Sequence, residues 1–408
     1  MSRASEISNN VYLGPTPDTS LPACWKGAPK FDVLIETSDL AQLPDNGTLK
    51  AWRGLLSRGD RLPLDIEFPS SGSIMPPSWS QSEVDGLMAM CSWIYKIANP
   101  NNDDDSNAEV DADGDSIMLT AMSKRKKVLI HCTDGYTESS LLGLAYFMYA
   151  EGLPVHDAWV QLHRDRGRNF FAYPSDVALL TSIQPRILQE SPRWRGDILT
   201  MKDPSWLSRL DGSLPSRILP YMYLGNLNHA NNPDLLKKLG ITRILSVGEP
   251  VAWPRETREQ WPADRLLYVD KVQDNGVDPL TNEFARCLKF IGTYQFGSRL
   301  RILTHRTEDG KHDGGATLVH CRVGVSRSAT ICIAEVMNEL NLSVPRAYCY
   351  VRARRLNVII QPHLRFMYEL LKWEEFQRTK RGQPLRRELE WATIAREIAL
   401  MNKPYSRQ

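Results

Sequence analysis

The sequence predicts an α/β protein made of two tandem, related domains, each a mixed β-sheet flanked by helices. A segment of the first half recurs in the second half, and short apolar strands alternate with amphipathic helices in both copies. The 408 residues are 42% hydrophobic and 24% charged, which is the composition of a globular protein long enough for two domains.

The internal repeat is clearest around two cysteines. The segment VLIHCTDGYTESS begins at Val128 and aligns with TLVHCRVGVSRSA, which begins at Thr317, so Cys132 pairs with Cys321 at an offset of 189 residues. Upstream, VYLG of the first copy matches MYLG of the second at an offset of 211 residues. The first copy therefore carries extra residues between the two matches.

The repeat divides the chain into four parts. We expect a degenerate first domain over 8–190, a linker over 191–211, a second domain over 212–378 and a helical extension over 379–408. The linker is rich in proline and charge. In the extension, the apolar spacing predicts a helix from Leu385 to Met401 that packs on a domain or, alternatively, binds a partner.

Two polar inserts interrupt the copies. The run from Pro100 to Ser116 is acidic and has no large apolar residue, so we expect a disordered loop in the first domain. A shorter polar insert runs from His305 to Gly315 in the second domain.

The second copy shows the predicted order of elements most clearly. Strands are expected at Tyr223–Leu224, Arg243–Val247, Leu266–Val272 and Thr317–His320. Helices are expected at Asn232–Leu239, Asn282–Gly292 and Arg327–Asn338.

Charge and cysteine usage limit the class of protein. Fifty basic and 48 acidic residues give a net charge of +2, which does not favour nucleic acid or a membrane surface as a partner. There is no apolar run of about 20 residues and no signal-peptide core. Seven scattered cysteines suggest free thiols in a reducing compartment and no zinc site. We expect a cytoplasmic protein, with nuclear import through the basic run Lys124–Lys127 as the alternative.

The loop HCRVGVSRS, from His320 to Ser328, lies between an expected strand and an expected helix. Backbone N–H groups of such a loop point inward and form a nest for an anion, and the helix N-terminus adds positive potential. Glycine allows the backbone to come close to a ligand. The expected phosphate-binding residues are Arg322, Val323, Gly324, Val325, Ser326 and Arg327.

Cys321 and Arg327 have different expected roles in this loop. Arg327 can hold two phosphate oxygens in a bidentate grip. The same positive field favours the thiolate of Cys321, which is a nucleophile near neutral pH. The alternative is a buried structural cysteine beside an unrelated arginine. The coincidence of His320, Gly324 and Ser328 in a strand-to-helix setting argues against it.

These residues resemble the signature loop of the dual-specificity protein phosphatases, within the cysteine-dependent phosphatase superfamily. The resemblance extends over nearly all of residues 216–375, and further matching positions are Tyr223, Leu224, Gly225, Ala347, Tyr348, Val351, Arg355, Pro362, Phe366 and Leu370. His363 departs from the family's usual asparagine. The tandem arrangement is similar to fungal members with a degenerate copy before an active one. The resemblance implies catalysis without a metal or other cofactor, and phosphorylated proteins as substrates.

The resemblance also implies a general acid in the loop after the strand that precedes the signature loop. Asp274 fits this position, and Asp278 is the alternative. The segment Trp261–Asp264 superficially resembles the acid loop of tyrosine phosphatases, but it precedes the strand and is expected to form a turn. Ser328 is expected to assist departure of the thiolate or, alternatively, to satisfy backbone groups at the helix start. His320 is expected to orient the loop.

The first copy lacks the phosphate grip. Glu138 stands where Arg327 stands in the second copy, and Asp134 adds another acid. Carboxylates beside Cys132 raise the pKa of a thiol and repel a phosphate dianion. We therefore expect a first domain that keeps the fold, has no phosphatase activity and serves as a regulatory or docking module.

The sequence thus predicts a protein phosphatase, active only in the second domain, that hydrolyses phosphotyrosine and phosphoserine or phosphothreonine through a cysteinyl-phosphate intermediate. One alternative is a phosphoinositide or RNA phosphatase of the same fold, which the single extra basic residue of the loop, Arg322, disfavours. Another is an inactive phosphoprotein-binding module, which Cys321, Arg327 and Asp274 disfavour. The sequence does not indicate an oligomeric state.

Overall fold

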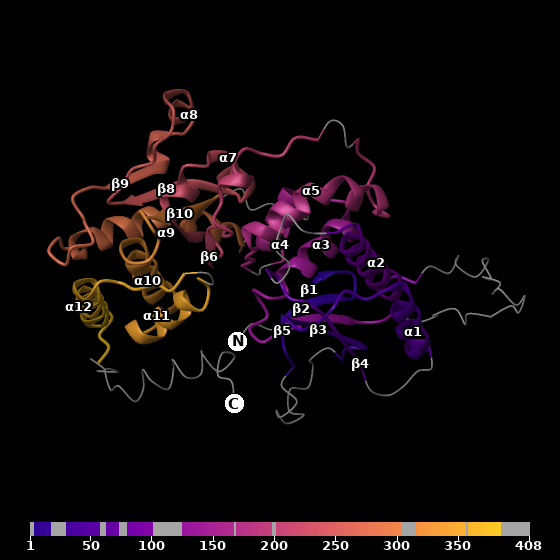
Figure 1. Cartoon of the computed structure of the whole chain (residues 1–408). Helices are drawn as coiled ribbons and strands as arrows, with labels where there is room; N and C mark the ends of the chain where they lie inside the picture. Colours follow the sequence, from indigo (N-terminus) through magenta and orange to yellow (C-terminus); the bar gives the residue numbers. More distant parts are fainter. Residues whose placement is uncertain are drawn as a thin grey trace, which may run out of the picture. The chain divides into compact units, whose positions relative to one another are not determined.

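The computed structural model of the chain forms two compact units, Met1–Gly212 and Ser213–Gln408 (Figure 1). The structure describes residues 4–17, 30–57, 63–72, 80–100, 125–166, 169–197, 201–302, 315–355 and 358–384. The acidic insert and the predicted helix from Leu385 to Met401 lie outside these residues, apart from Pro100 at the insert's start. So do Lys124 and most of the second insert.

Each unit contains a five-stranded mixed sheet. In the first, the strands are β1 Ser5–Ser8, β2 Val11–Pro15, β3 Val33–Ser38, β4 Leu64–Pro69 and β5 Val128–Cys132. In the second, they are β6 Ser216–Leu219, β7 Met222–Gly225, β8 Ile241–Val247, β9 Leu266–Val269 and β10 Ala316–His320. The orders are β1-β2-β5-β3-β4 and β6-β7-β10-β8-β9, and only the β1–β2 and β6–β7 pairs are antiparallel. The two sheets therefore share one topology, which matches the sequence repeat.

Helices cover both sheets. The first unit has α1 Asn46–Ser57, α2 Gln81–Ala98, α3 Ser140–Glu151, α4 Val155–Arg164 and α5 Pro174–Glu190. The second has α6 Leu227–Ala230, α7 Pro233–Lys238, α8 Arg255–Glu259, α9 Thr281–Ile302, α10 Arg327–Leu340, α11 Val344–Arg352 and α12 Leu364–Lys380. None of the helices in the described part of the chain is both long enough and apolar enough to cross a membrane.

The core of each unit lies around the central strand and the helix that follows it. All five residues of β5 and all five of β10 are buried, as expected for strands with parallel neighbours on both sides. The helix α3 is apolar on every side, and all of its residues from Ser140 to Ala150 are buried. The central loop of each unit is thus held between two buried elements.

The predicted fold class is confirmed, and most element boundaries differ by a few residues. The expected helix Asn282–Gly292 lies within α9, which continues to Ile302. The expected strand Leu266–Val272 ends earlier, at Val269. Lys271 has a positive φ of 58°, which is incompatible with an extended strand.

The described residues of the segment predicted as a linker pack with the first unit from its start, where the Ser191 hydroxyl donates to the Tyr149 carbonyl at 2.6 Å. Trp206 is 2% exposed, and its ring lies edge-on to that of His156, with the ring centroids 6.4 Å apart. The Ala172 N–H donates to the Gly212 carbonyl at 3.1 Å. The division between the units therefore falls between Gly212 and Ser213.

We predict that Trp206→Ala destabilises the first unit by about 3–5 kcal/mol, because it removes a large buried ring and leaves a cavity. Chemical unfolding of the full chain, followed by circular dichroism, measures this effect. Lys202→Ala, at an exposed position of the same segment, should change stability by less than about 0.5 kcal/mol. Equal stability of the two variants would mean that residues 201–211 contribute nothing to the first unit.

Candidate active site

The predicted signature loop connects β10 to α10 at the carboxyl ends of parallel strands. β10 pairs in parallel with β7 on one side and β8 on the other. In open α/β sheets this edge is where ligands bind. The topology therefore places Cys321 and Arg327 where a substrate can reach both.

A left-handed glycine sets the course of the loop. Gly324 has a φ of +79°, and a Cβ at this position would lie 2.5 Å from the Gly225 carbonyl oxygen. In the first unit Gly135 has a φ of +71°, and its Cβ would lie 2.3 Å from the Pro15 nitrogen. Both loops thus make the same tight turn against the end of a neighbouring strand, β7 in the second unit and β2 in the first, where only glycine fits.

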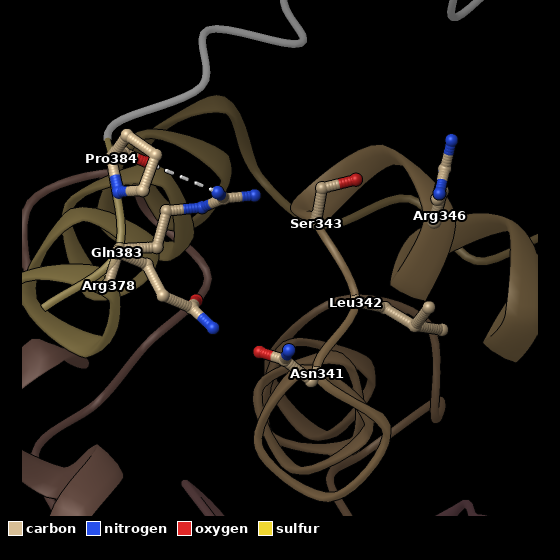
Figure 2. A pocket seen from close by; sticks show the side chains of 7 residues that line it. All are labelled: Asn341, Leu342, Ser343, Arg346, Arg378, Gln383 and Pro384. Carbon is tan, nitrogen blue, oxygen red and sulfur yellow. Dashed lines mark hydrogen bonds between the residues drawn. The ribbon is translucent and has the colours of Figure 1, made fainter. Parts of the chain in front are cut away.

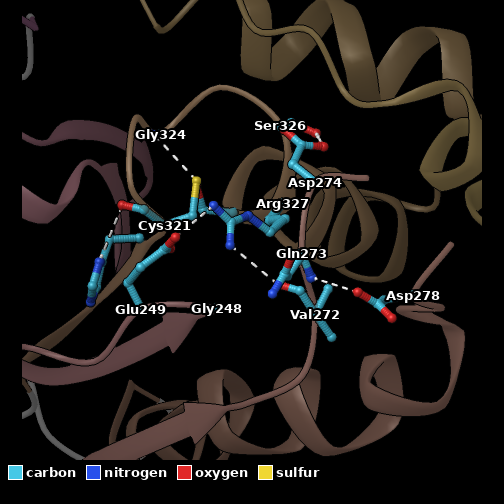
Figure 3. Close-up of polar contacts among 12 residues, drawn as sticks. Gly248, Glu249, Val272, Gln273, Asp274, Asp278, Cys321, Gly324, Ser326 and Arg327 are labelled. Atoms are coloured by element: carbon cyan, nitrogen blue, oxygen red, sulfur yellow. Dashed lines mark hydrogen bonds and ion pairs between the residues drawn. The ribbon is translucent and has the colours of Figure 1, made fainter. Parts of the chain in front are cut away.

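The Cys321 sulfur accepts two hydrogen bonds within the loop. The Gly324 N–H donates to Sγ at 3.3 Å (Figure 3). The Ser328 hydroxyl donates to the same atom at 3.1 Å. The side chain is buried, with 3% of its surface exposed. Two donors aimed at the sulfur stabilise negative charge on it, as a nucleophilic or departing thiolate requires.

The Arg327 guanidinium lies beside Cys321, between two fixed acceptors (Figure 3). Nη1 donates to the Val272 carbonyl at 3.2 Å, and Nη2 donates to Glu249 Oε1 at 3.1 Å. The arginine is 8% exposed, so the Glu249 carboxylate supplies the countercharge that a buried guanidinium needs.

Gly248 makes this position of Arg327 possible. It has a φ of +91°, and a Cβ there would lie 1.9 Å from Nη1 of Arg327. Neither Gly248 nor Glu249 was predicted as a site residue. They follow β8 directly, at the same edge of the sheet as the signature loop, and this position was the available signal.

Asp274 is attached to the signature loop. Its Oδ1 accepts a hydrogen bond of 2.7 Å from the Ser326 hydroxyl, and the same hydroxyl accepts the His363 N–H at 3.0 Å. Asp278 points away from Cys321 and accepts the Gln273 N–H at 3.1 Å within its own loop (Figure 3). The structure therefore brings Asp274, and not Asp278, to the loop.

The backbone donors of the loop divide into two groups. The Gly324 N–H is directed at the sulfur. Among the described residues, the N–H groups of Val325 and Ser326 have no hydrogen-bond acceptor. Arg322 and Val323 have exposed side chains, with Val323 57% exposed. The loop thus presents unused donors to a ligand above Cys321.

His320 is a buried, neutral residue beneath the loop. Its Nε2 lies 2.7 Å from the Ser246 hydroxyl, and Nδ1 lies 3.4 Å from the Cys321 carbonyl oxygen. Burial lowers the pKa of His320 to about 4, so the ring carries no charge at neutral pH. These contacts suit a residue that orients the loop.

A separate pocket of about 290 Å³ lies at the C-terminal ends of α10 and α12, away from the signature loop (Figure 2). It is lined by Asn341, Leu342, Ser343, Arg346, Arg378, Gln383 and Pro384. Figure 2 shows the Arg378 side chain directed into it, donating to the Pro384 carbonyl at 3.2 Å. None of the predicted site residues lines this pocket. Within the described chain, no group of three or more His, Cys, Asp or Glu side chains is placed to hold a metal ion.

Comparisons with known proteins agree with this geometry. Residues 222–376 match the family "Dual specificity phosphatase, catalytic domain". The chain is 30% identical over 459 aligned residues to the dual specificity protein phosphatase PPS1 of Saccharomyces cerevisiae, covering 92% of this chain and 51% of the yeast protein. It is 32% identical over 160 residues to human dual specificity protein phosphatase 1, covering 39% of this chain and 37% of the human protein.

A solved structure also aligns with part of the chain. The Yvh1 phosphatase domain of Chaetomium thermophilum is 26% identical, with a TM-score of 0.32, and the match covers 38% of this chain and 92% of that domain. The chain spans about half the length of the yeast relative and about a third of the human one. Residues 222–376 are thus similar to the catalytic domain of the dual specificity phosphatases.

Proposed function

We propose that the second unit hydrolyses phosphoric monoesters on proteins, both phosphotyrosine and phosphoserine or phosphothreonine, and that it supplies all of the chain's phosphatase activity. One observation carries the proposal. The Cys321 sulfur, the unused N–H groups of Val325 and Ser326, the Arg327 guanidinium and Asp274 all belong to one loop or contact it.

Phosphoryl transfer to the enzyme is the first half of the reaction. The Cys321 thiolate attacks phosphorus, and the S–P bond forms as the P–O bond to the substrate oxygen breaks. Asp274, in its acid form, gives its proton to that oxygen. The loop amides and Arg327 hold the three non-bridging oxygens, whose charge is thereby stabilised throughout the transfer.

Hydrolysis of the phosphocysteine is the second half. Asp274, now a carboxylate, takes a proton from a water molecule as the water oxygen attacks phosphorus. The S–P bond breaks, the electron pair returns to Cys321, and inorganic phosphate leaves. The Ser328 hydroxyl, 3.1 Å from the sulfur, donates to the departing thiolate and lowers the energy of this step.

Protein substrates suit the chemistry around the loop better than the alternatives. The curated relatives described above are named as dual specificity protein phosphatases. Beside Arg327, the loop offers only Arg322 as a cation, whereas a phosphoinositide carries several phosphates that need separate countercharges. An inactive binding module has no use for an acid such as Asp274 tied to the signature loop.

The central test is turnover of an aryl phosphate and of phosphopeptides by the full chain. Cys321→Ser should abolish both activities, because a serine hydroxyl does not ionise at this site. Cys132→Ser should leave the rate within about twofold, since the first unit has Glu138 in place of the arginine. Loss of all activity in Cys132→Ser with an unchanged unfolding curve would show that the first unit takes part in catalysis.

Asp274→Ala should lower kcat by roughly 10²–10⁴, because the leaving oxygen loses its proton donor. The loss should be larger for phosphoserine peptides than for an activated aryl phosphate, whose leaving group needs little protonation. Steady-state kinetics on both substrates measures this difference. Asp278→Ala is the matched control and should be nearly normal. The reverse result, an inactive Asp278→Ala beside a normal Asp274→Ala, would assign the acid to the other carboxylate.

Gly248→Ala should reduce kcat/KM by roughly 10²–10³, the usual cost of losing one preorganised charge-stabilising group, because the new methyl group displaces Arg327. Gly240→Ala is a close control. Gly240 also has a positive φ, +72°, but no atom lies within 4 Å of its Cβ position. This variant should cost some stability and leave the kinetics normal. Equal kinetics for the two variants would mean that the position of Arg327 does not limit the rate.

A further inference from the structure

The signature loop of the first unit holds one of its own carboxylates. Asp134 Oδ1 accepts the Tyr136 N–H at 2.7 Å and the Thr137 N–H at 3.2 Å. Oδ2 accepts the Thr137 hydroxyl at 3.2 Å, and the Cys132 thiol donates to Oδ1 at 3.2 Å. Four donors of the loop therefore converge on one side chain.

The two corresponding backbone N–H groups have no acceptor among the described residues of the second unit. At the offset of 189 residues, Tyr136 corresponds to Val325 and Thr137 to Ser326. The N–H groups of Val325 and Ser326 have no acceptor among the described residues, and their neighbour at the position of Asp134 is the apolar Val323. The turn is the same in both loops, as the left-handed Gly135 and Gly324 show. The difference lies in what occupies the nest.

We propose that the first unit retains an oxyanion-binding loop and that the Asp134 carboxylate is its permanent occupant. The assignment rests on the proposed function in one respect, since it takes the second loop as the phosphate site. In the first unit, the carboxylate stands where a phosphate group would accept the loop N–H groups. Phosphoproteins are then excluded from this loop by occupancy, in addition to the loss of the arginine.

The neighbouring groups fit a resident anion. Burial raises the pKa of the Cys132 thiol, and the Asp134 carboxylate raises it further, so the sulfur stays protonated and donates to the carboxylate. The side chain of Glu138 is exposed to solvent. A second carboxylate is therefore tolerated at the loop because it stays in water, where its repulsion is screened.

Because Asp134 occupies the nest, the signature loop of the first unit keeps its conformation without a bound ligand. Buried or constrained N–H groups without acceptors cost free energy, and Asp134 removes that cost in the first unit. The first unit is thus suited to a structural or docking role that uses surfaces other than its signature loop.

The test is the stoichiometry of tungstate binding to the full chain, measured by isothermal titration calorimetry. Tungstate is a phosphate-like oxyanion. We expect one site in the wild-type chain, one site in Glu138→Arg, and two sites in the double variant Asp134→Val/Glu138→Arg, which has the second loop's residues at these two positions. The pair Asp134→Val/Glu67→Arg adds the same charge at an exposed strand position and should show one site.

The outcomes separate the two proposals. No site in the wild-type chain would contradict the phosphate site of the second unit. Two sites in the wild-type chain or in Glu138→Arg, or one site in the folded double variant, would overturn the role of Asp134. If Asp134→Val/Glu138→Arg does not fold, Asp134→Ser/Glu138→Arg removes the carboxylate while keeping a polar side chain.

The converse variant tests the inference in the active loop. Val323→Asp puts a carboxylate at the position of Asp134, where it should accept the N–H groups of Val325 and Ser326. We expect the loss of tungstate binding and a fall in kcat/KM of at least roughly 10²-fold, the cost of losing such donors. Val323→Asn, which carries no charge, should bind tungstate more tightly than the aspartate variant. Unchanged binding by folded Val323→Asp would refute the proposal.

Discussion

The turn that aims successive backbone N–H groups at one point is the constraint on which both units depend. It needs glycine at 135 and 324, because each lies against the neighbouring strand end with a positive φ. Once made, the turn creates a region of positive potential at the start of α3 or α10. Such a region favours an anion. In one unit Asp134 supplies it, and in the other the N–H groups of Val325 and Ser326 have no acceptor among the described residues.

In the second unit, a single guanidinium links three separate segments. Arg327 begins α10, bonds the carbonyl of Val272 from the acid loop, and pairs with Glu249 after β8. A buried arginine without a countercharge would be strongly destabilising, so Glu249 fixes the guanidinium as well as neutralising part of its charge. The contact between Ser326 and Asp274 then ties the acid to the same loop. One network therefore positions Arg327 together with the proposed nucleophile Cys321 and the proposed acid Asp274.

Local sequence patterns and the family resemblance account for the site residues that the sequence predicts. Cys321 and Arg327 lie six residues apart between a recognisable strand and helix, and Asp274 followed from the family resemblance. Glu249 stands 78 residues from Arg327, and no periodicity connects the two. The proline and charge content of residues 191–211 predicts a linker. Within this segment, however, the closely spaced Trp206, Leu207 and Leu210 are all buried. Composition averages over a segment, whereas packing depends on a few side chains.

The sequence shows the two carboxylates of the first loop but does not predict the hydrogen bonds that Asp134 makes. From the sequence, Asp134 and Glu138 are two carboxylates that repel phosphate. In the structure, Asp134 reaches the N–H groups two and three residues ahead, which is the local geometry in which aspartate caps its own backbone. Position 138 keeps a main-chain role, since its carbonyl accepts the Ser71 N–H at 2.7 Å. The residues at positions 134 and 138 are thus physically connected. Because the Asp134 carboxylate occupies the nest, no arginine is needed at position 138 to bind an anion, and the Glu138 side chain faces solvent.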